Sequence, residues 1–448
     1  MYRKIIEELR RWKEADTRKP LILKGVRQCG KTWILQEFAK NNFEDVAYVN
    51  FETDPRLRDI FDRDLNVGRI IRELGDFRHK RIDPAQTVLI FDEIQACPPA
   101  LTSLKYFHEN MPELAILCAG SLLGIALAAP LSFPVGKVTF LTLYPMNFEE
   151  FLLANHQDYL AESLATVTCP DDISPVLFDE FADWYYTYLL VGGFPEAVTE
   201  WCMSRNLDAV DAILDNILQS YELDFAKHAP HTEFPRISAV WNAVPAQLAK
   251  ENRKFVYSSV QSGGRARTLA DAVEWLMRAG LIHKVSLAEQ PMVPLSAAAD
   301  LSAFKLYLCD VGLLRRMSRF PAEILRSTAQ DTSLMRGALT ENFICTELLS
   351  SRIPAEYYWK SGNQAEIEFI VPVGSQVVPI EVKAGLHTKG RSLSVYRAKY
   401  HPGYAVRFSQ KHPGEVTDEY GTLISLPLFV ASCLERVCSQ PLRSLESR

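Results

Sequence analysis

A glycine-rich stretch near the N-terminus constrains the fold more than any other feature of this 448-residue chain. Residues 25–32 read GVRQCGKT and match the pattern GxxxxGK[ST] at every fixed position. The apolar run Leu21–Lys24 precedes the pattern and predicts a strand, and Lys31–Asn41 predicts a helix after it. A phosphate-binding loop requires this strand–loop–helix context. The sequence therefore predicts an α/β domain that binds a nucleotide.

The chemistry of phosphate binding explains the residue types in this loop. Glycine lets the backbone fold around phosphate oxygens, so that consecutive amides point inward, and the following helix adds the positive end of its dipole. Lys31 is expected to reach the β- and γ-phosphates of ATP, and the Thr32 hydroxyl to bind Mg²⁺. The alternative is a glycine-rich turn that carries a lysine by chance. The residues predicted to contact the nucleotide are Gly25, Val26, Arg27, Gln28, Cys29, Gly30, Lys31 and Thr32.

A second motif supplies the acidic half of the predicted site. Thr87–Phe91 is an apolar strand that ends in Asp92 and Glu93. Ligands of open α/β sheets bind at the carboxyl ends of the strands, so Asp92 is predicted to hold Mg²⁺ and Glu93 to orient and deprotonate the attacking water. The alternative is an acidic pair that caps a helix. Ser121 follows another predicted strand, Leu114–Cys118, and is a candidate γ-phosphate or water contact; a helix cap is equally compatible with its position.

The hydrophobic pattern divides the chain into four segments. Residues 1–147 alternate apolar runs with helical stretches and predict a parallel sheet with helices on both faces. Residues 148–228 predict a helix-rich region. Residues 229–324 place two helices before a strand pair, which is the order of a winged helix-turn-helix. Residues 325–448 predict a further α/β domain.

Composition excludes several classes of protein. The net charge of −6 argues against nucleic-acid binding through overall positive charge, although a local basic patch stays open. The nine cysteines include no CxxC pair, which favours a reduced, cytoplasmic protein over a disulfide scaffold or a zinc module. The uncharged stretch Leu114–Val135 is long enough to span a bilayer, but its glycines and prolines favour a buried strand and a short helix.

The motifs resemble those of a known group of proteins. The segments LILKGVRQCGKT, YVNFE, IFDEIQ, CAGSLL and LYPMNFEEFL resemble a prokaryotic branch of the AAA-type P-loop ATPases, whose members carry a C-terminal domain of uncharacterised function. The resemblance covers nearly the whole chain and implies ATP binding, a helical lid and a winged helix behind it. Relatives tend to have an arginine about where Lys137 stands, and lysine cannot make the planar two-pronged contact of arginine. Lys137 is therefore a weak candidate for a cation near the phosphates, and no arginine finger is assigned.

A proline in the second segment gives a further candidate contact. Val191–Pro195 reads VGGFP and resembles the GxP module of STAND-type signalling ATPases. The resemblance implies that Pro195 packs near the adenine of the bound nucleotide. The alternative is a turn that only ends a helix.

Carboxylates in the last segment form another candidate site. Ala365–Ile370 and Pro379–Lys383 predict two strands whose acidic side chains share a face, and a carboxylate pair with a nearby lysine can bind Mg²⁺ and stabilise phosphoryl charge. The pattern resembles the PD-(D/E)xK nuclease core, with Glu368 where an aspartate is expected, and the longer glutamate leaves metal binding and cleavage open. The alternative is a solvated hairpin without activity. The residues that the resemblance assigns are Glu341, Glu368, Glu381 and Lys383.

These patterns lead to three hypotheses for the function. The first is a cytoplasmic, Mg²⁺-dependent ATPase that acts as a nucleotide-controlled switch or remodelling protein. The second is an ATP-regulated nuclease, with duplex DNA contacted by Arg265 and Arg267 at the start of a predicted recognition helix. The third is a nucleotide-loaded scaffold for a protein partner that does not hydrolyse ATP. No membrane partner is predicted, and the sequence does not indicate an oligomeric state.

Overall fold

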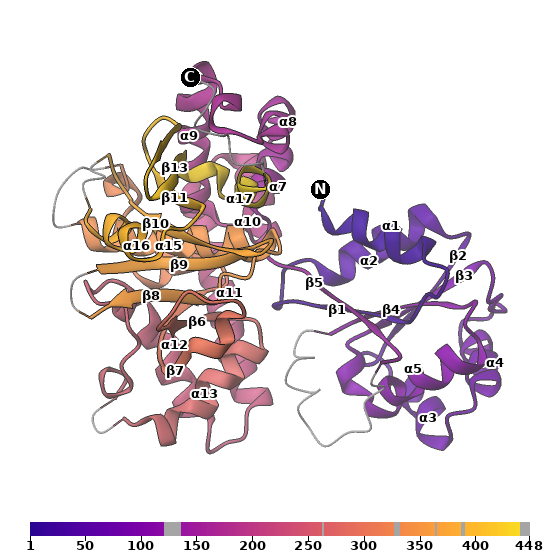
Figure 1. Cartoon of the computed structure of the whole chain (residues 1–448). Coiled ribbons are helices and arrows are strands. Elements are labelled where there is room, and N and C mark those ends of the chain that lie inside the picture. Colours follow the sequence, from indigo (N-terminus) through magenta and orange to yellow (C-terminus); the bar gives the residue numbers. More distant parts are fainter. Residues whose placement is uncertain (121–135, 262–263, 327–331, 363–364, 387–389, 440–448) are drawn as a thin grey trace. The chain divides into compact units, whose positions relative to one another are not determined.

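The computed structural model describes the chain except residues 121–135, 262–263, 327–331, 363–364, 387–389 and 440–448 (Figure 1). The described residues form two compact units. The first unit comprises Met1–Tyr144 with Arg278–Leu281, and the second comprises Pro145–Met277 with Ile282–Arg448. The first boundary lies three residues before the end of the predicted ATPase segment at residue 147 (147 − 144).

The first unit contains a five-stranded sheet in the order β2-β3-β4-β1-β5. Every neighbouring pair in it is parallel. All residues of β3 and β4 are buried, which explains their continuous apolar sequences. The strands are β1 (Leu21–Lys24), β2 (Asp45–Asn50), β3 (Thr87–Asp92), β4 (Ala115–Ala119) and β5 (Thr139–Thr142).

Helices cover both faces of this sheet, as the sequence predicts (Figure 1). The helices α1 (Ile5–Glu14) and α2 (Lys31–Asn42) lie on one face, and the other face carries α3 (Pro55–Arg63), α4 (Val67–Phe77) and α5 (Pro98–Asn110). Local signals set several helix starts; the Asp54 side chain accepts a hydrogen bond from the Arg56 amide, and Pro55 occupies the first helical position. Phe51, Phe61 and Phe91 meet edge to face at centroid distances of 5.4–5.6 Å in the core.

The helical part of the second unit follows the predicted order. A reciprocal capping box between Asn147 and Glu150 starts α7. The spacing of apolar residues in the sequence also predicts helices at 178–190, 206–221, 236–250 and 268–279, and these overlap α9, α11, α12 and α13. The helices are α7 (Phe148–Ala154), α8 (Asp158–Thr166), α9 (Pro175–Val191), α10 (Pro195–Ser204), α11 (Leu207–His228), α12 (Phe234–Leu248), α13 (Ala266–Arg278) and α14 (Val311–Met317).

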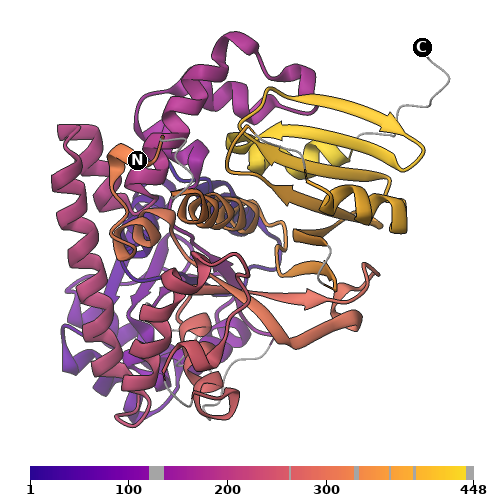
Figure 2. The ribbon, with the colours of Figure 1, turned by 90° about the vertical axis from the view of Figure 1, so that its left-hand side faces the viewer.

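An eight-stranded sheet fills the rest of the second unit, in the order β12-β13-β11-β10-β9-β8-β6-β7 (Figure 2). Its strands are β6 (Ile282–Ala288), β7 (Ala299–Leu308), β8 (Tyr357–Ser361), β9 (Ala365–Val373), β10 (Gln376–Val382), β11 (Tyr404–Ser409), β12 (Gly414–Asp418) and β13 (Gly421–Pro427). The helices α15 (Ser333–Ser350), α16 (Ser392–Tyr400) and α17 (Leu434–Cys438) accompany them.

The predicted wing strands belong to this same sheet. β6 pairs antiparallel with β7 and parallel with β8, so strands on both sides of residue 324 form one ladder. The sequence therefore predicts the strand pair but not its partner. Apart from Arg278–Leu281, residues 229–324 and 325–448 lie within one compact unit.

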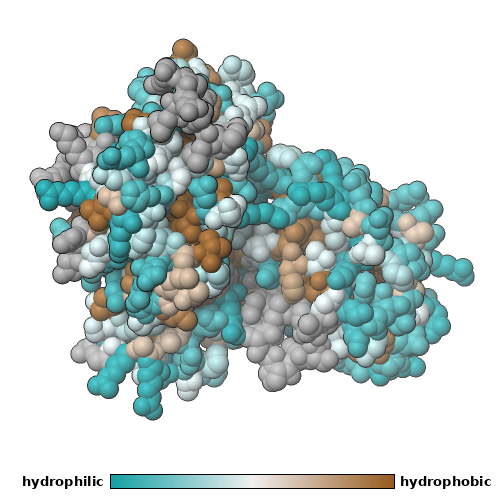
Figure 3. Space-filling model, viewed as in Figure 1, coloured by the Kyte–Doolittle hydropathy of each residue, from teal (hydrophilic) through white to brown (hydrophobic). Residues whose placement is uncertain are grey.

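The described surface gives no sign of a membrane span. None of the described helices combines the length and the apolar character needed to cross a bilayer. The strand predicted at the start of the uncharged stretch is present as β4, and the stretch from Ser121 onwards lies outside the described residues. The face drawn in Figure 3 is mostly hydrophilic, with hydrophobic residues in small groups.

Candidate functional site

The phosphate-binding loop connects β1 to α2 and has the backbone conformation that its glycines allow. Gly25 and Gly30 have φ values of 155° and 93°. A Cβ on Gly25 would lie 2.3 Å from the Leu143 carbonyl oxygen and 3.0 Å from Cys29 Sγ. Glycine is therefore required at this position by close packing as well as by the backbone angle.

The side chain of Lys31 bonds to the backbone of its own loop. Its Nζ donates hydrogen bonds to the carbonyl oxygens of Gly25 at 3.0 Å and Val26 at 2.7 Å, and the residue is only 6% exposed. The ammonium group thus lies at the backbone of the predicted phosphate cradle. Phosphate oxygens would compete with these two carbonyls for its protons.

A buried arginine that the sequence analysis missed supports the loop from the side. Arg3 is 4% exposed, and its guanidinium donates to the Cys29 carbonyl at 3.0 Å and to the Tyr144 carbonyl at 2.6 Å. The amide of Leu143 donates to the Lys24 carbonyl at 2.7 Å. The loop backbone is therefore tied to both the N-terminus and the end of β5. A single arginine before an amphipathic helix carries no sequence signal for this role.

Thr32 and Asp92 come together at the carboxyl ends of β1 and β3, as predicted. Thr32 Oγ1 lies 3.2 and 3.0 Å from the two carboxylate oxygens of Asp92. Hydroxyl and carboxylate oxygens are ligands that Mg²⁺ accepts, usually together with water and substrate phosphates. The described residues contain no cluster of three or more His, Cys, Asp or Glu side chains suited to a metal. The donor set fits a Mg²⁺ ion that the nucleotide and water help to coordinate.

Tyr48 and Asn50 on the neighbouring strand complete the surroundings of Asp92. The Tyr48 hydroxyl donates to Asp92 Oδ2 at 2.6 Å, and Asn50 Nδ2 donates to the Tyr48 oxygen at 3.2 Å. Burial and then the bond to Asp92 raise the pKa of Tyr48 to about 12, so the phenol keeps its proton at neutral pH. The register of β2 on β3 pairs Asn50 with Asp92. Neither residue was predicted, because this register is not visible in the sequence.

Glu93 is held in an uncommon backbone conformation. Its φ of 49° and ψ of 44° are left-handed, and such a conformation costs a non-glycine residue about 1 kcal/mol or more. Gln95 Nε2 donates to Glu93 Oε2 at 2.5 Å, which orients the carboxylate. Strained residues of this kind concentrate at functional sites. Glu93 therefore has the fixed orientation that a general base needs.

Two further predictions for this site have different outcomes. Ser121 lies outside the described residues. The placement of Lys137 near the phosphates is wrong, because Thr139 at the start of β5 pairs with Leu21 at the start of β1, whereas the loop follows the other end of β1. Lys137 instead forms an ion pair with Glu109 at 3.2 Å.

Close packing and hydrogen bonds hold the VGGFP turn of the second unit in place. A Cβ on Gly192 would lie 2.4 Å from a carboxylate oxygen of Asp310, and the Gly193 amide donates to Asp310 at 2.7 Å. The Met146 amide donates to the Gly193 carbonyl at 2.7 Å. Pro195 follows as the first residue of α10. Its contact with adenine stays a prediction.

The predicted C-terminal carboxylates are buried, so the alternative of a solvated hairpin is wrong. β9 and β10 pair antiparallel, and the pair Phe369–Ile380 places Glu368 opposite Glu381. Glu368 is 8% exposed and accepts the Val382 amide at 3.0 Å. Glu381 is fully buried and lies 2.6 Å from Arg407 Nε and 3.4 Å from Lys383 Nζ.

Cations already neutralise most of these acids. Glu341 pairs with Arg253 and accepts the Tyr307 hydroxyl at 3.0 Å. Lys305, 1% exposed, lies 2.6 Å from Glu366. Burial first, and then the neighbouring charge of Glu341, raise the pKa of Glu368. The described residues thus form a buried network of ion pairs here.

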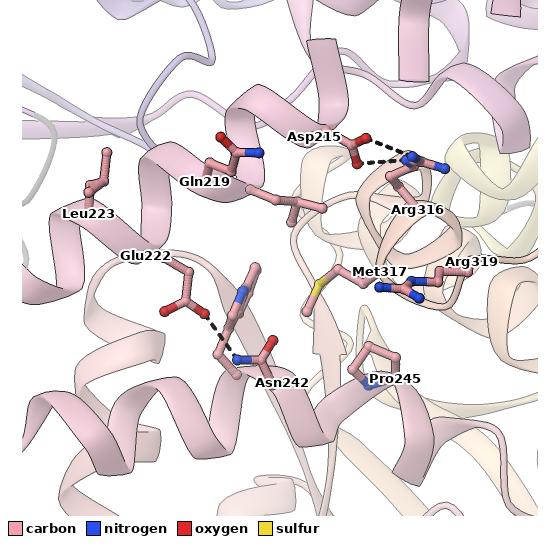
Figure 4. Close-up of a pocket in the computed structure, with 11 residues that line it drawn as sticks. Asp215, Gln219, Glu222, Leu223, Asn242, Pro245, Arg316, Met317 and Arg319 are labelled. Atoms are coloured by element: carbon pink, nitrogen blue, oxygen red, sulfur yellow. Dashed lines mark hydrogen bonds and ion pairs between the residues drawn. The ribbon is translucent and has the colours of Figure 1, made fainter. Parts of the chain in front are cut away.

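Two other features of the second unit bear on ligand binding. Arg265 and Arg267 are exposed around the start of α13, where a DNA contact stays a prediction. A cavity of about 530 Å³ lies between α11, α12 and the end of α14 (Figure 4). Four of its polar residues form pairs, Asp215 with Arg316 and Glu222 with Asn242. None of the predicted site residues line this cavity.

Comparison with known protein families supports the prediction of a P-loop ATPase domain in the first unit. A family model described as an AAA domain matches residues 17–152. Models for two domains of unknown function, DUF8612 and DUF4143, match residues 182–324 and 336–429. A search of curated proteins gives no match. Residues 17–152 are therefore an AAA-type P-loop ATPase domain, and the nuclease-like reading of the C-terminal part gains no support from these families.

Solved structures with a similar fold are distant in sequence. A Walker-type ATPase of Pyrococcus abyssi is 14% identical, with 70% of this chain and 95% of that chain covered and a TM-score of 0.44. The RuvB Holliday junction branch migration motor of Thermotoga maritima is 14% identical, with coverages of 65% and 90% and a TM-score of 0.30. The Drosophila ORC bound to DNA is 13% identical, with coverages of 70% and 93% and a TM-score of 0.24. These TM-scores are too low to support conclusions about function.

Proposed function

We propose that this chain binds and hydrolyses ATP with Mg²⁺ and acts as a nucleotide-controlled switch or remodelling protein. The single observation that carries the proposal is the pairing of Thr32 with Asp92 at 3.0 Å, next to the loop that Lys31 closes. Thr32 and Asp92 are 60 positions apart in sequence. Together with Lys31 they bring a hydroxyl, a carboxylate and a cation to one edge of the sheet. Phosphoryl transfer needs this combination to hold and neutralise the triphosphate.

Each residue of the site has a separate role in the proposed hydrolysis. Lys31 and the loop amides would bind the β- and γ-phosphates, which requires Lys31 to exchange its carbonyl partners for phosphate oxygens. Thr32 and Asp92 would hold Mg²⁺, which neutralises phosphate charge when bound. Glu93 would accept the proton of the attacking water, and Gln95 would keep its carboxylate in place. The predicted contact of Pro195 with adenine would make the position of the helices after it depend on the bound nucleotide.

Two variants test the site. We expect Lys31→Ala to abolish detectable ATP binding in calorimetry, because the loop loses the cation predicted to contact the β- and γ-phosphates. We expect Glu93→Gln to bind ATP normally but to lower turnover by about 10²–10⁴-fold, the usual contribution of a general base. Lys40→Ala, an exposed lysine near the end of α2, is the matched control. Unchanged ATP affinity in Lys31→Ala would refute the assignment.

A second candidate function is an ATP-regulated DNA nuclease. The order α15, three strands, α16, β11 favours it, as does the placement of Glu368 opposite Glu381. The ion pairs of Glu341 and Glu381 with arginines weigh against it, because a divalent metal would have to displace these cations. Cleavage of duplex DNA with Mg²⁺ or Mn²⁺ that disappears in Lys383→Ala would establish this function.

The same turnover assay separates the remaining possibilities. Turnover should be measured with and without duplex DNA, in the wild type and in Glu93→Gln. Stimulation by DNA that vanishes in Glu93→Gln would favour an ATPase that acts on nucleic acid. Slow turnover indifferent to DNA would favour a switch with a protein partner, and tightly bound nucleotide without any turnover would favour a scaffold.

A further inference from the structure

The cavity of about 530 Å³ between α11, α12 and the end of α14 takes no part in the proposed function (Figure 4). Its volume lies in the range of small-molecule sites, about 300–1,000 Å³. Leu223 lines it and is 71% exposed, although it is a large apolar side chain. The other apolar residues of the wall are Leu218, Trp241, Pro245 and Met317. The cavity thus has the apolar walls that are typical of a ligand site.

Four charged side chains line the cavity, and two of them pair with each other. Arg316 donates to both carboxylate oxygens of Asp215, each at 2.6 Å. Glu222 instead accepts hydrogen bonds from two neutral groups, a serine hydroxyl and an asparagine amide. Arg319 is exposed, and its side chain forms no ion pair or hydrogen bond within the described part of the chain. One negative and one positive group are therefore left, and Figure 4 shows Glu222 and Arg319 on opposite sides of the cavity.

Trp241 adds two polar groups whose hydrogen bonds the fold does not supply. Pro245 lies four residues after Trp241 inside α12 and has no N–H, so the Trp241 carbonyl lacks its usual helical donor. The indole N–H of Trp241 has no acceptor among the described residues, although the side chain is only 1% exposed. Trp241 and Pro245 both line the cavity. Since buried polar groups are normally hydrogen-bonded, a ligand with its own donor and acceptor would fit this wall.

We propose that this cavity binds a short peptide of two or three residues with free termini. The peptide carboxylate pairs with Arg319, and the peptide ammonium group pairs with Glu222. A peptide backbone presents carbonyls and amides in alternation, which match the donor and the acceptor of Trp241. An apolar side chain of the peptide packs against Leu218 and Met317.

Other classes of ligand match these groups less well. A polyanion such as a nucleotide would be repelled by Glu222, and a purely apolar molecule would leave Arg319 without a partner. A single amino acid carries both charged groups on one carbon atom and is less suited to partners on opposite sides of the cavity. All residues that line the cavity belong to the second unit, so the inference does not depend on the nucleotide site.

The test removes the two charges of the peptide one at a time. Calorimetry on the full chain should compare the tripeptide Ala-Phe-Ala with free termini, with an acetylated N-terminus and with an amidated C-terminus. We expect each blocked form to bind about ten-fold more weakly than the free form, the size of one lost charged hydrogen bond. Arg319→Gln should bind the free and amidated forms alike, and Glu222→Gln should bind the free and acetylated forms alike.

Arg391→Gln is the matched control, because Arg391 is an exposed arginine of the same unit that does not line the cavity. It should keep the wild-type preference for both free termini. Arg319 is itself exposed, so its replacement should leave the fold intact, which circular dichroism checks. Equal affinity of the wild type for all three forms, or no binding of any form, would overturn the inference. A preference for the free carboxylate that persists in Arg319→Gln would overturn it too.

Discussion

Asp92 is the residue on which the two halves of the candidate site depend, and Tyr48 is its closest partner. The Tyr48 hydroxyl lies 2.6 Å from one carboxylate oxygen, and the Thr32 hydroxyl lies 3.0 Å from the same oxygen. Partners of this kind fix the direction of a metal ligand without touching the metal. Tyr48 is thus a positioning residue for the predicted Mg²⁺ site.

Tyr48→Phe should therefore impair the use of Mg²⁺ more than the binding of nucleotide. Loss of an outer partner costs about 10–100-fold in metal affinity or activity. We expect the Mg²⁺ concentration for half-maximal ATP turnover to rise, while ATP affinity measured without Mg²⁺ stays the same. Tyr106→Phe, on α5, is the matched control. An unchanged Mg²⁺ dependence would contradict this role.

At the scale of residues, short-range patterns predicted the loop and the acidic pair but not their supports. The spacing of Gly25, Lys31 and Thr32 reflects local chemistry that one segment contains. Arg3 and Tyr48 act only through chain folding, because Arg3 reaches Tyr144 across 141 positions and Tyr48 reaches Asp92 across 44. Single side chains with such distant partners carry no pattern of their own.

The junction of α9, α10 and α14 depends on one buried acid, Asp310. Its carboxylate accepts the Gly193 amide at 2.7 Å and the Leu313 amide at 2.9 Å, so it caps α14 and holds the turn before Pro195. Asp310 is 2% exposed, and burial raises its pKa from 3.8 to about 6. The ionised form is therefore less favourable in the folded state than in the unfolded chain.

This shift predicts a pH dependence of stability. Between about pH 4 and pH 6 the folded state keeps a proton on Asp310 that the unfolded state has lost, so the free energy of unfolding falls as pH rises. Asp310→Asn removes this titration. We expect the difference in stability between wild type and Asp310→Asn to shrink from pH 4 to about pH 6 and then to level off. Thermal melts across this range measure it, and parallel curves for the two proteins would contradict it.

The longest helices and most strands could be predicted, whereas β5, β12 and β13 could not. β1 matches its predicted range, because Pro20 and the glycine-rich loop flank the short apolar run and fix where the strand begins and ends. β12 (GEVTD) is almost entirely exposed and carries few residues that favour strands. Its conformation comes from pairing with β13, which depends on contacts rather than on local preference. For β7 the sequence predicts a start at Lys305, but the strand begins six residues earlier, at Ala299, inside the Ala-rich linker.

At the scale of the whole molecule, buried charges connect the predicted winged segment to the C-terminal segment. Arg253 and Lys305 come from the first of these, and their partners Glu341 and Glu366 come from the second. Buried pairs of this kind are weak sources of stability when intact, but the loss of one partner leaves an uncompensated charge. The cations of one segment thus neutralise buried carboxylates of the other.

A double-mutant cycle tests this dependence. Arg253→Met should destabilise the second unit by about 3–5 kcal/mol, because Glu341 then stays buried without its guanidinium partner. Adding Glu341→Gln should recover a large part of the loss, since a neutral amide still accepts the Tyr307 hydroxyl. Denaturant unfolding of the full chain gives the four free energies. Additive effects of the two substitutions would contradict the coupling.

The shared sheet has a consequence for how such chains can be divided during evolution. The two matching families of unknown function meet between residues 324 and 336, yet β6 and β8 hydrogen-bond across that junction. A gene that kept only the later part would expose the unpaired edge of β8, and Glu341 would lose Arg253 and Glu366 would lose Lys305. Recombination at this junction would therefore yield aggregation-prone fragments, and the two families should be inherited together.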